Sequence, residues 1–201
     1  MLRRSRQQYW GKSLMVQQDE DADHRIVQHF FALRGLLAEA IPKAVRRTPD
    51  FKISRDAQLV AFCEVKSPQD IFTERVNRAI TLGHAGDIET GYGNDYRQAR
   101  CIERAARKAA SQFAVANSTH LVPNILVVVN HDAHADVEDF VQTLTGTLQG
   151  RVVATGMQNT IPEIDLYAWL DQKDRRNEPT ARVIYNHHSP LKETVRTLLQ
   201  L

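Results

Sequence analysis

Cysteine is scarce in this sequence, and its scarcity limits the class of protein. The 201 residues include only two cysteines, Cys63 and Cys101. Two cysteines supply neither a disulfide framework nor a zinc-ligand set. We therefore expect a protein of a reducing compartment, the cytoplasm.

Long apolar runs are absent as well. No stretch reaches the roughly 18 apolar residues of a membrane span, and the N-terminus has no apolar run of signal-peptide length. Residues 1–18 instead carry three arginines and predict a basic arm, either frayed or in contact with an anionic partner. We expect no membrane partner.

The sequence also has little net charge. A formal charge of +2 gives no global signal for nucleic-acid binding, so any such signal must come from a local cluster. Four of the nine glycines fall in Gly83–Asp95, which has neither helical nor strand periodicity and predicts a long loop. Because this loop lacks the lysine and Ser/Thr of a phosphate-binding loop, we expect a lid or an insertion.

The chain is long enough for one substantial core, and its apolar spacing changes between helical and strand periods. With 42% hydrophobic residues, residues 1–201 predict a single mixed α/β domain. An apolar stripe of Ile26, Phe30, Leu33 and Leu37 predicts a first helix over Asp19–Ile41, ended by Pro42. "DFKI" and "LVAFCEV", separated by the polar "SRDAQ", predict a β-hairpin.

The remaining predicted elements alternate between helix and strand. They are a short helix over Asp70–Ile80, a helix over Asp95–Asn117, a buried strand "NILVVV", a helix "VEDFVQTLTGTL", strands "IDLYAWL" and "ARVIYN", and a C-terminal helix that starts at Ser189.

The hairpin carries charged residues that folding alone does not require. Alternate side chains of a strand share a face, so Glu64 and Lys66 point one way while Cys63 and Val65 point toward the core. Asp50 begins the partner strand, so the two carboxylates are expected to meet at the end of the sheet. A structural alternative is an edge strand with alternating charges and a turn opened by Pro49.

A pair of carboxylates at this position can hold a hard divalent cation. Mg²⁺, or Mn²⁺ in its place, takes one or two carboxylates and fills its other positions with water and phosphate. Asp50 and Glu64 would supply the carboxylates, and the backbone carbonyl of Val65 a third oxygen. The Lys66 ammonium would offset negative charge at the attacking water or at a phosphate.

Through "TPDF" and "FCEVKSP" the chain resembles the PD-(D/E)xK nuclease superfamily. The resemblance implies a restriction-endonuclease-like core, a central mixed β-sheet flanked by helices, with Asp50, Glu64 and Lys66 as its catalytic residues. The family core of helix, strand meander, helix and strand corresponds to about residues 19–130, which leaves 131–201 as peripheral strands and a C-terminal helix. The family's strand before the motif aspartate would have to lie in "KAVRRT".

The helix over Asp95–Asn117 carries five cations opposite its apolar stripe. A row of cations suits a phosphate backbone, although such rows are also found on solvated surfaces. The row consists of Arg97, Arg100, Arg104, Arg107 and Lys108. The resemblance further implies that a Gln or Lys of this helix reaches the active site, with Gln112 first and Lys108 second.

The resemblance also implies that an acid of the first helix joins the metal. Asp23 and Glu20 are the alternatives, because Glu39 points away from the apolar stripe on a helical wheel. Four histidines come in pairs without a third zinc ligand at suitable spacing, and we expect no metal role for them. They are His131, His134, His187 and His188.

These observations predict a Mg²⁺- or Mn²⁺-dependent nuclease, with DNA as the favoured substrate and RNA left open. The alternative is a nucleic-acid-binding or assembly subunit that keeps the fold without turnover. A homodimer or a place in a larger assembly is compatible with either function.

Overall fold

The computed structural model describes residues 20–43, 48–67, 95–131, 137–145, 147–148, 151–152, 161–172 and 180–200. Its centre is a six-stranded mixed sheet in the order β1-β2-β3-β4-β7-β8. The strands are β1 (Leu37–Ala40), β2 (Phe51–Arg55), β3 (Gln58–Lys66), β4 (Asn124–Asn130), β7 (Leu166–Asp171) and β8 (Thr180–Tyr185). The helices are the N-terminal helix (20–32), α3 (Asp95–Ala116), α4 (Val137–Thr145) and α5 (Lys192–Leu199), and β5 (Thr147–Leu148) pairs separately with β6 (Arg151–Val152).

The sheet combines an antiparallel meander with a parallel centre. β1 pairs antiparallel with β2, and β2 pairs antiparallel with β3. β3, β4 and β7 run parallel to one another, and β8 pairs antiparallel with β7. The chain passes from β3 to the parallel β4 through α3, as parallel pairing requires a crossover connection. The carboxyl ends of β3, β4 and β7 therefore lie at one edge of the sheet.

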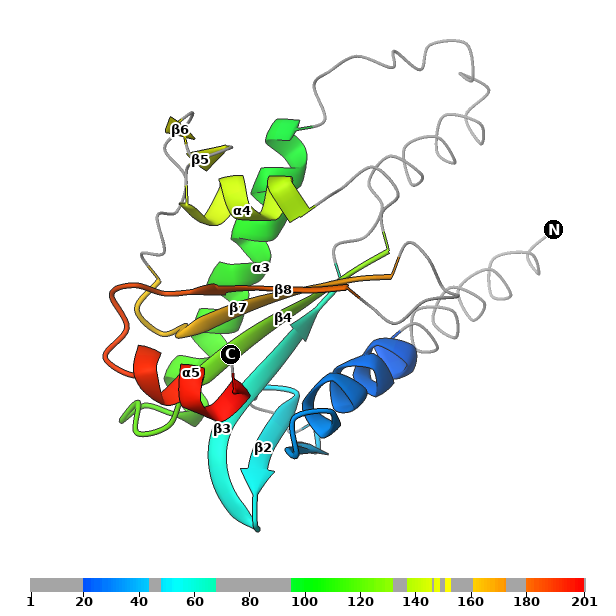
Figure 1. The fold of residues 1–201 in the computed structure, drawn as a ribbon, viewed down its shortest axis with the longest axis vertical. Helices are drawn as coiled ribbons and strands as arrows, with labels where there is room; N and C mark the ends of the chain where they lie inside the picture. The colour runs from blue at the N-terminus through cyan, green and yellow to red at the C-terminus, as the bar shows by residue number, and fades with distance from the viewer. Residues whose placement is uncertain are drawn as a thin grey trace, which may run out of the picture.

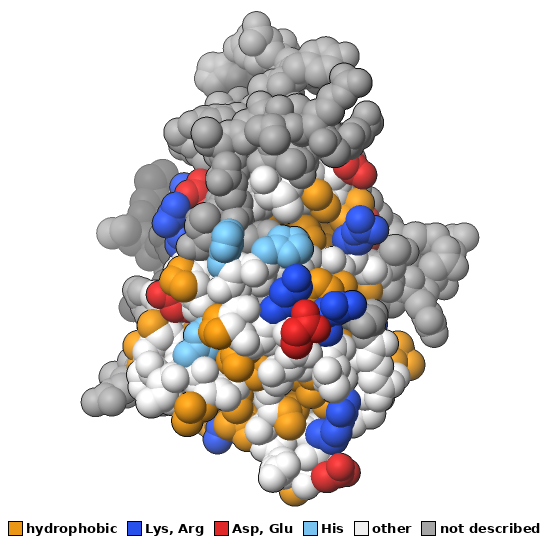
Figure 2. All heavy atoms as spheres, turned by 60° about the vertical axis from the view of Figure 1, so that its left-hand side comes forward, with side chains coloured by type: hydrophobic (Ala, Val, Ile, Leu, Met, Phe, Trp, Pro, Cys, Tyr) orange, Lys and Arg blue, Asp and Glu red, His pale blue; other side chains and the backbone are white. Residues whose placement is uncertain are grey.

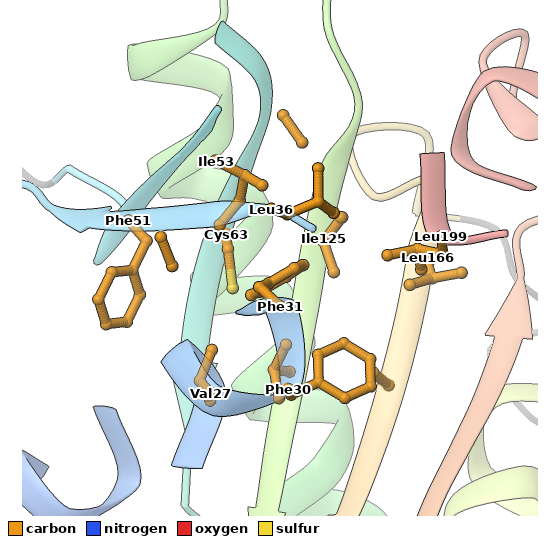
Figure 3. Close-up of a cluster of buried hydrophobic side chains, with 14 of the residues drawn as sticks. Val27, Phe30, Phe31, Leu36, Phe51, Ile53, Cys63, Ile125, Leu166 and Leu199 are labelled. Atoms are coloured by element: carbon orange, nitrogen blue, oxygen red, sulfur yellow. The ribbon is translucent and has the colours of Figure 1, made fainter. Parts of the chain in front are cut away.

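Helices cover both faces of the sheet (Figure 1). β4 contributes Ile125, Val127 and Val129 to one core and Leu126 and Val128 to the other, as alternation along a strand dictates. The first core is closed by the N-terminal helix and α5, and Figure 3 shows the aromatic rings of the former against these strands. The second core is closed by α3 and α4. A strand apolar on both faces is typical of a buried parallel sheet.

The first helix is shorter than its apolar spacing predicts. It ends at residue 32, and Gly35 adopts the left-handed region with φ of 66°. The Leu36 N–H donates to the Phe31 carbonyl at 3.1 Å and the Gly35 N–H to the Ala32 carbonyl at 3.0 Å, the pair of bonds that defines a Schellman motif. The prediction of a helix to residue 41 is therefore wrong.

The residues after this motif form β1 instead of helix. Leu33 and Leu37, predicted for the buried stripe, are 63% and 59% exposed, while Val27 and Phe31 are buried in their place. A strand does precede Asp50, namely β1, and it lies before the "KAVRRT" stretch in which a strand is expected. Residues 44–47 of that stretch lie outside the described ranges.

The hairpin prediction is confirmed. β2 and β3 are joined by Asp56 and Ala57, whose φ values of 51° and 62° are those of a type I′ turn. β3 lies between β2 and β4, so the alternative of a charged edge strand is wrong. Cys63 is fully buried among the apolar residues of the first core, as expected.

Most later elements match their predictions. α3, β4, β7 and β8 lie where periodicity places them. Two boundaries differ, since α4 ends at Thr145 before β5, and α5 begins after an N-cap at Leu191 instead of at Ser189. The basic arm, the predicted helix 70–80 and the loop 83–94 fall outside the described residues. None of the described helices is long and apolar enough to cross a bilayer.

Replacement of Gly35 tests the Schellman motif. A Cβ at Gly35 would meet no atom within 4 Å, so Gly35→Ala should be destabilising only through its left-handed backbone. We expect a loss of about 1 kcal/mol in the free energy of unfolding, measured by urea denaturation. Gly35→Asn should lose less, because asparagine tolerates this region. Equal stability of the alanine variant and the native protein would contradict the motif.

Candidate metal centre and active site

The register of β2 and β3 brings Asp50 and Glu64 together. Phe51 pairs with Cys63, so the next position outward places Asp50 opposite Glu64. The Asp50 carbonyl accepts the Ile41 N–H at 2.8 Å, and its Oδ2 accepts the Val65 N–H at 2.8 Å. These two bonds fix both the backbone and the carboxylate of Asp50 at the carboxyl end of β3.

Glu64 is a buried acid with one unused oxygen. Only 1% of the residue is exposed, its Oε1 contacts the Lys66 ammonium, and its Oε2 has no hydrogen-bond partner among the described residues. Burial, followed by repulsion from Asp50, raises the pKa of Glu64 to about 7, while Lys66 and Gln112 act in the opposite direction. Repulsion from Asp50 is the second cause of the raised pKa, as expected for two carboxylates on paired strands.

Lys66 and Val65 complete the part of the site that β3 carries. The Lys66 side chain is 18% exposed and forms a salt bridge with Glu64. In an antiparallel ladder the N–H and C=O of one residue point to the same neighbouring strand. Because the Val65 N–H bonds to Asp50, the Val65 carbonyl also faces the Asp50 side of β3. Lys66 thus contacts Glu64, and the Val65 carbonyl faces Asp50.

The N-terminal helix adds two side chains to Asp50. Glu20, His24 and Asp50 each offer a ligand atom within 4.8 Å of the others, which makes them a candidate group for a metal ion. His24 Nε2 lies 4.0 Å from Asp50 Oδ1, and its ring packs edge-on against Phe51 with centroids 4.8 Å apart. Sequence reasoning missed His24, although Glu20 and His24 are four residues apart and so share a helix face.

Glu20 is the helix acid that the structure places at the site. Its contact with Lys43 lowers the pKa of Glu20; burial opposes that shift, and the charges of His24 and Lys66 add to it. Asp23, the other alternative, turns away toward Ser67 and His131. Glu39 lies on β1 opposite Lys52 and is exposed, and it does not belong to the group of Glu20, His24 and Asp50.

The buried carboxylates of the described residues differ in how their oxygens are satisfied. Asp165 accepts bonds from His120, from the Asn124 N–H and from Ser189, so both of its oxygens have partners. Both oxygens of Asp23 are likewise bonded. Glu64 alone among these three keeps an oxygen without a partner. Since a buried orphan oxygen is costly, this position fits a cation ligand better than a structural acid.

Gln112 of α3 reaches the same region from the other side. Its Nε2 donates to the Thr48 carbonyl at 2.9 Å, and its buried Oε1 has no partner among the described residues. Gln112 also lowers the pKa of Glu64, as the smallest of the causes, through an approach of the two side chains that does not reach hydrogen-bond geometry. The side chain therefore holds the segment before Asp50 and lies close to Glu64, whereas Lys108 is exposed.

The structure describes only part of the predicted row of cations on α3. Arg104, Arg107 and Lys108 are exposed, but the side chains of Arg97 and Arg100 lie outside the description. Arg107 is paired with Glu103 at 2.8 Å. On the face drawn in Figure 2, lysine and arginine side chains occur in small separate groups, several with an acid beside them. This face has no single continuous basic surface among the described residues.

The histidines predicted to have no metal role are divided by the structure. His187 and His188 are exposed, and His134 lies outside the described residues. His131 follows β4 directly and bonds to Asp23 at 2.6 Å. It does not belong to the group of Glu20, His24 and Asp50.

Comparison of the chain with protein-family models, with curated proteins and with solved structures finds no match.

The raised pKa of Glu64 makes stability depend on pH. The pKa of Glu64 is 4.5 in the unfolded state and about 7 in the metal-free folded state. Between these two pH values the folded protein keeps a proton on Glu64 that the unfolded protein has released. Stability should therefore fall as pH rises through this window, by up to about 3 kcal/mol. Urea unfolding in EDTA from pH 5 to 8 measures this decline.

The control for this prediction is Glu64→Gln, which cannot ionise. The difference in stability between native protein and variant removes the contribution of every other titrating group. This difference should change with pH across the window, and Mg²⁺ should restore stability to the native protein at pH 8. Parallel curves for the two proteins would contradict the buried, interacting Glu64.

Proposed function

We propose that this protein is a Mg²⁺- or Mn²⁺-dependent nuclease of the PD-(D/E)xK superfamily with a restriction-endonuclease-like fold. The observation that carries the proposal is the orphan Oε2 of buried Glu64 beside Asp50, at the carboxyl end of β3. The order of N-terminal helix, three-stranded meander, α3 and β4 supports the fold assignment. DNA as the substrate is taken from the resemblance of the motif residues.

The donor set fits a hard cation with some tolerance for softer ones. Asp50 and Glu20 of the candidate group offer oxygen, which Mg²⁺ and Mn²⁺ prefer. Glu64 is not a member of that group, and its Oε2 and the Val65 carbonyl would add their oxygens from β3. His24 adds a nitrogen donor, which Mn²⁺ accepts more readily than Mg²⁺ does. A bound cation would neutralise phosphate charge and lower the pKa of a water.

The other residues act on substrate and geometry. Lys66 is placed to offset charge on a phosphate, and its salt bridge with Oε1 of Glu64 leaves Oε2 for a cation. Gln112 holds the Thr48 carbonyl and thereby the segment that carries Asp50. Exposed Arg104 and Lys108 of α3 can contact a phosphate backbone in a salt-dependent way.

Removal of the Lys66 ammonium tests the catalytic assignment. In a plasmid-nicking assay with Mg²⁺, we expect Lys66→Ala to lower the cleavage rate by about 100-fold or more, because charge at the phosphate is left without its partner. EDTA should abolish cleavage by the native protein. Lys52→Ala removes an exposed lysine of the neighbouring strand β2 and should cleave normally.

Two outcomes would reject a metal-dependent nuclease. Cleavage that persists in EDTA would exclude the metal centre. Retention of DNA in a gel-shift assay, without metal dependence and without cutting under any condition, would identify the alternative, a binding or assembly subunit. Melting temperatures of both lysine variants establish that the proteins compared are folded.

Substitution of His24 tests the nitrogen ligand. His24→Ala should weaken Mn²⁺ binding by at least about tenfold in titration calorimetry, since even loss of an outer-sphere partner weakens metal binding by that factor. His29→Ala is the matched control, an exposed histidine of the same helix. Unchanged Mn²⁺ affinity in His24→Ala would remove His24 from the ligand set and leave the oxygen donors.

A further inference from the structure

Asp23 forms a second buried cluster next to the candidate metal centre. Its Oδ2 accepts the Ser67 hydroxyl, and its Oδ1 lies 2.6 Å from His131 Nε2. Asp23 is only 3% exposed, although it belongs to the first turns of the N-terminal helix. We refer to Asp23, Ser67 and His131 as the Asp23 cluster.

The Asp23 cluster joins three separate parts of the fold. Asp23 belongs to the same first turns of the N-terminal helix, three residues after Glu20 and directly before His24. Ser67 directly follows Lys66 at the end of β3, and His131 directly follows β4. The cluster therefore ties the turn that carries Glu20 and His24 to the strand that carries Glu64 and Lys66.

The arrangement argues against two other roles for Asp23. Both of its oxygens are already bonded, so it does not offer a cation the vacant oxygen that Glu64 offers. A serine-hydrolase triad is excluded as well, because there the serine bonds to the imidazole, whereas here serine and imidazole both bond to the carboxylate.

Burial explains why the cluster can fix geometry. A carboxylate that is almost fully buried must keep its hydrogen bonds, since loss of a partner leaves an uncompensated charge. Apolar packing of this helix against the sheet begins at Ile26 and Val27 and continues through Phe30 and Phe31 (Figure 3). The turn before Ile26 is held at the sheet by the hydrogen bonds of Asp23 and by the edge-on contact of the His24 ring with Phe51.

We propose that Asp23 is a positioning residue that sets the distance between the helix side of the metal centre, Glu20 and His24, and the β3 side, Glu64 and Lys66. Asp23 touches neither cation nor substrate in this role. The inference deepens the proposed function and rests on it for the metal, while the mechanical link between helix and strand can be measured without any metal.

The test compares two variants of Asp23 in the full chain. Asp23→Asn keeps an oxygen that can accept from Ser67 and an amide nitrogen that can face His131. Asp23→Leu has a side chain of similar size that can form neither hydrogen bond. Asp21→Asn changes an exposed acid of the same turn and is the control. The readouts are Mn²⁺ affinity by calorimetry, plasmid nicking, and amide hydrogen exchange of residues 20–27 in metal-free protein.

If Asp23 is a positioning residue, Asp23→Leu and Asp23→Asn should differ in Mn²⁺ affinity, nicking rate and hydrogen exchange. Asp23→Leu should weaken Mn²⁺ binding and slow nicking by about 10- to 100-fold, as loss of a supporting partner does at metal sites. It should also speed exchange in residues 20–27 relative to the strands. Asp23→Asn and Asp21→Asn should stay close to the native protein in all three measurements.

Other results would overturn the proposal. Equal loss of Mn²⁺ affinity in Asp23→Asn and Asp23→Leu would make Asp23 a ligand, since an amide cannot replace an anionic oxygen. Native exchange in Asp23→Leu would show that the turn is held without the cluster. If Asp23→Leu does not fold, Ser67→Ala removes one of the two bonds, and native exchange and affinity in that variant would equally refute positioning.

The two proposals can fail separately. If the native protein binds no Mn²⁺ and cuts no DNA, the proposed function is wrong. Hydrogen exchange still decides then whether Asp23 holds the turn against β3.

Discussion

The antiparallel register between β2 and β3 is the constraint on which the candidate site depends. Pairing of Phe51 with Cys63 places Asp50 opposite Glu64, and the bond from the Val65 N–H to Asp50 Oδ2 fixes the carboxylate there. A shift of one residue would turn Glu64 into the first core and Cys63 toward the face that α3 covers, so burial of Cys63, Ala61 and Ile53 in the first core protects the register. The same packing that builds the first core therefore sets the distance between the two acids.

The two edges of the parallel strands carry different kinds of polar structure. Near the start of β4 and β7, Asp165 is fully satisfied by His120, Asn124 and Ser189, and Asn186 adds bonds to the carbonyls of Ile161 and Ile164. Such a closed network specifies how loops and strands meet. At the opposite edge Glu64 retains an oxygen without a partner. The contrast within one protein distinguishes an acid that serves the fold from one that can serve chemistry.

Sequence reasoning identified the parts of the site that depend on local pattern. Asp50, Glu64 and Lys66 could be placed because strand alternation and one short hairpin determine their relation. The end of the first helix was misplaced, since Leu33 and Leu37 continue an apolar spacing that the Gly35 motif interrupts.

Contacts between distant segments could not be predicted in the same way. Asp23 is 44 residues from Ser67 and 108 residues from His131, and no periodicity relates them. His24 was missed because a histidine four residues from a glutamate on a helix is also a common surface pattern. Only the docking of the helix on the sheet shows that both side chains face Asp50.

The tight turn at Asp56 and Ala57 determines how the two acids of the candidate site come together. Asp50 and Val65 are 15 residues apart and belong to one hairpin, a structure that closes in roughly 1–10 μs in isolation. Contacts within this one hairpin thus suffice to bring the two repelling carboxylates face to face, and the helix that carries His24 is not needed for it. Lys66 belongs to the same hairpin, so its positive charge is beside the two acids whenever the hairpin is formed.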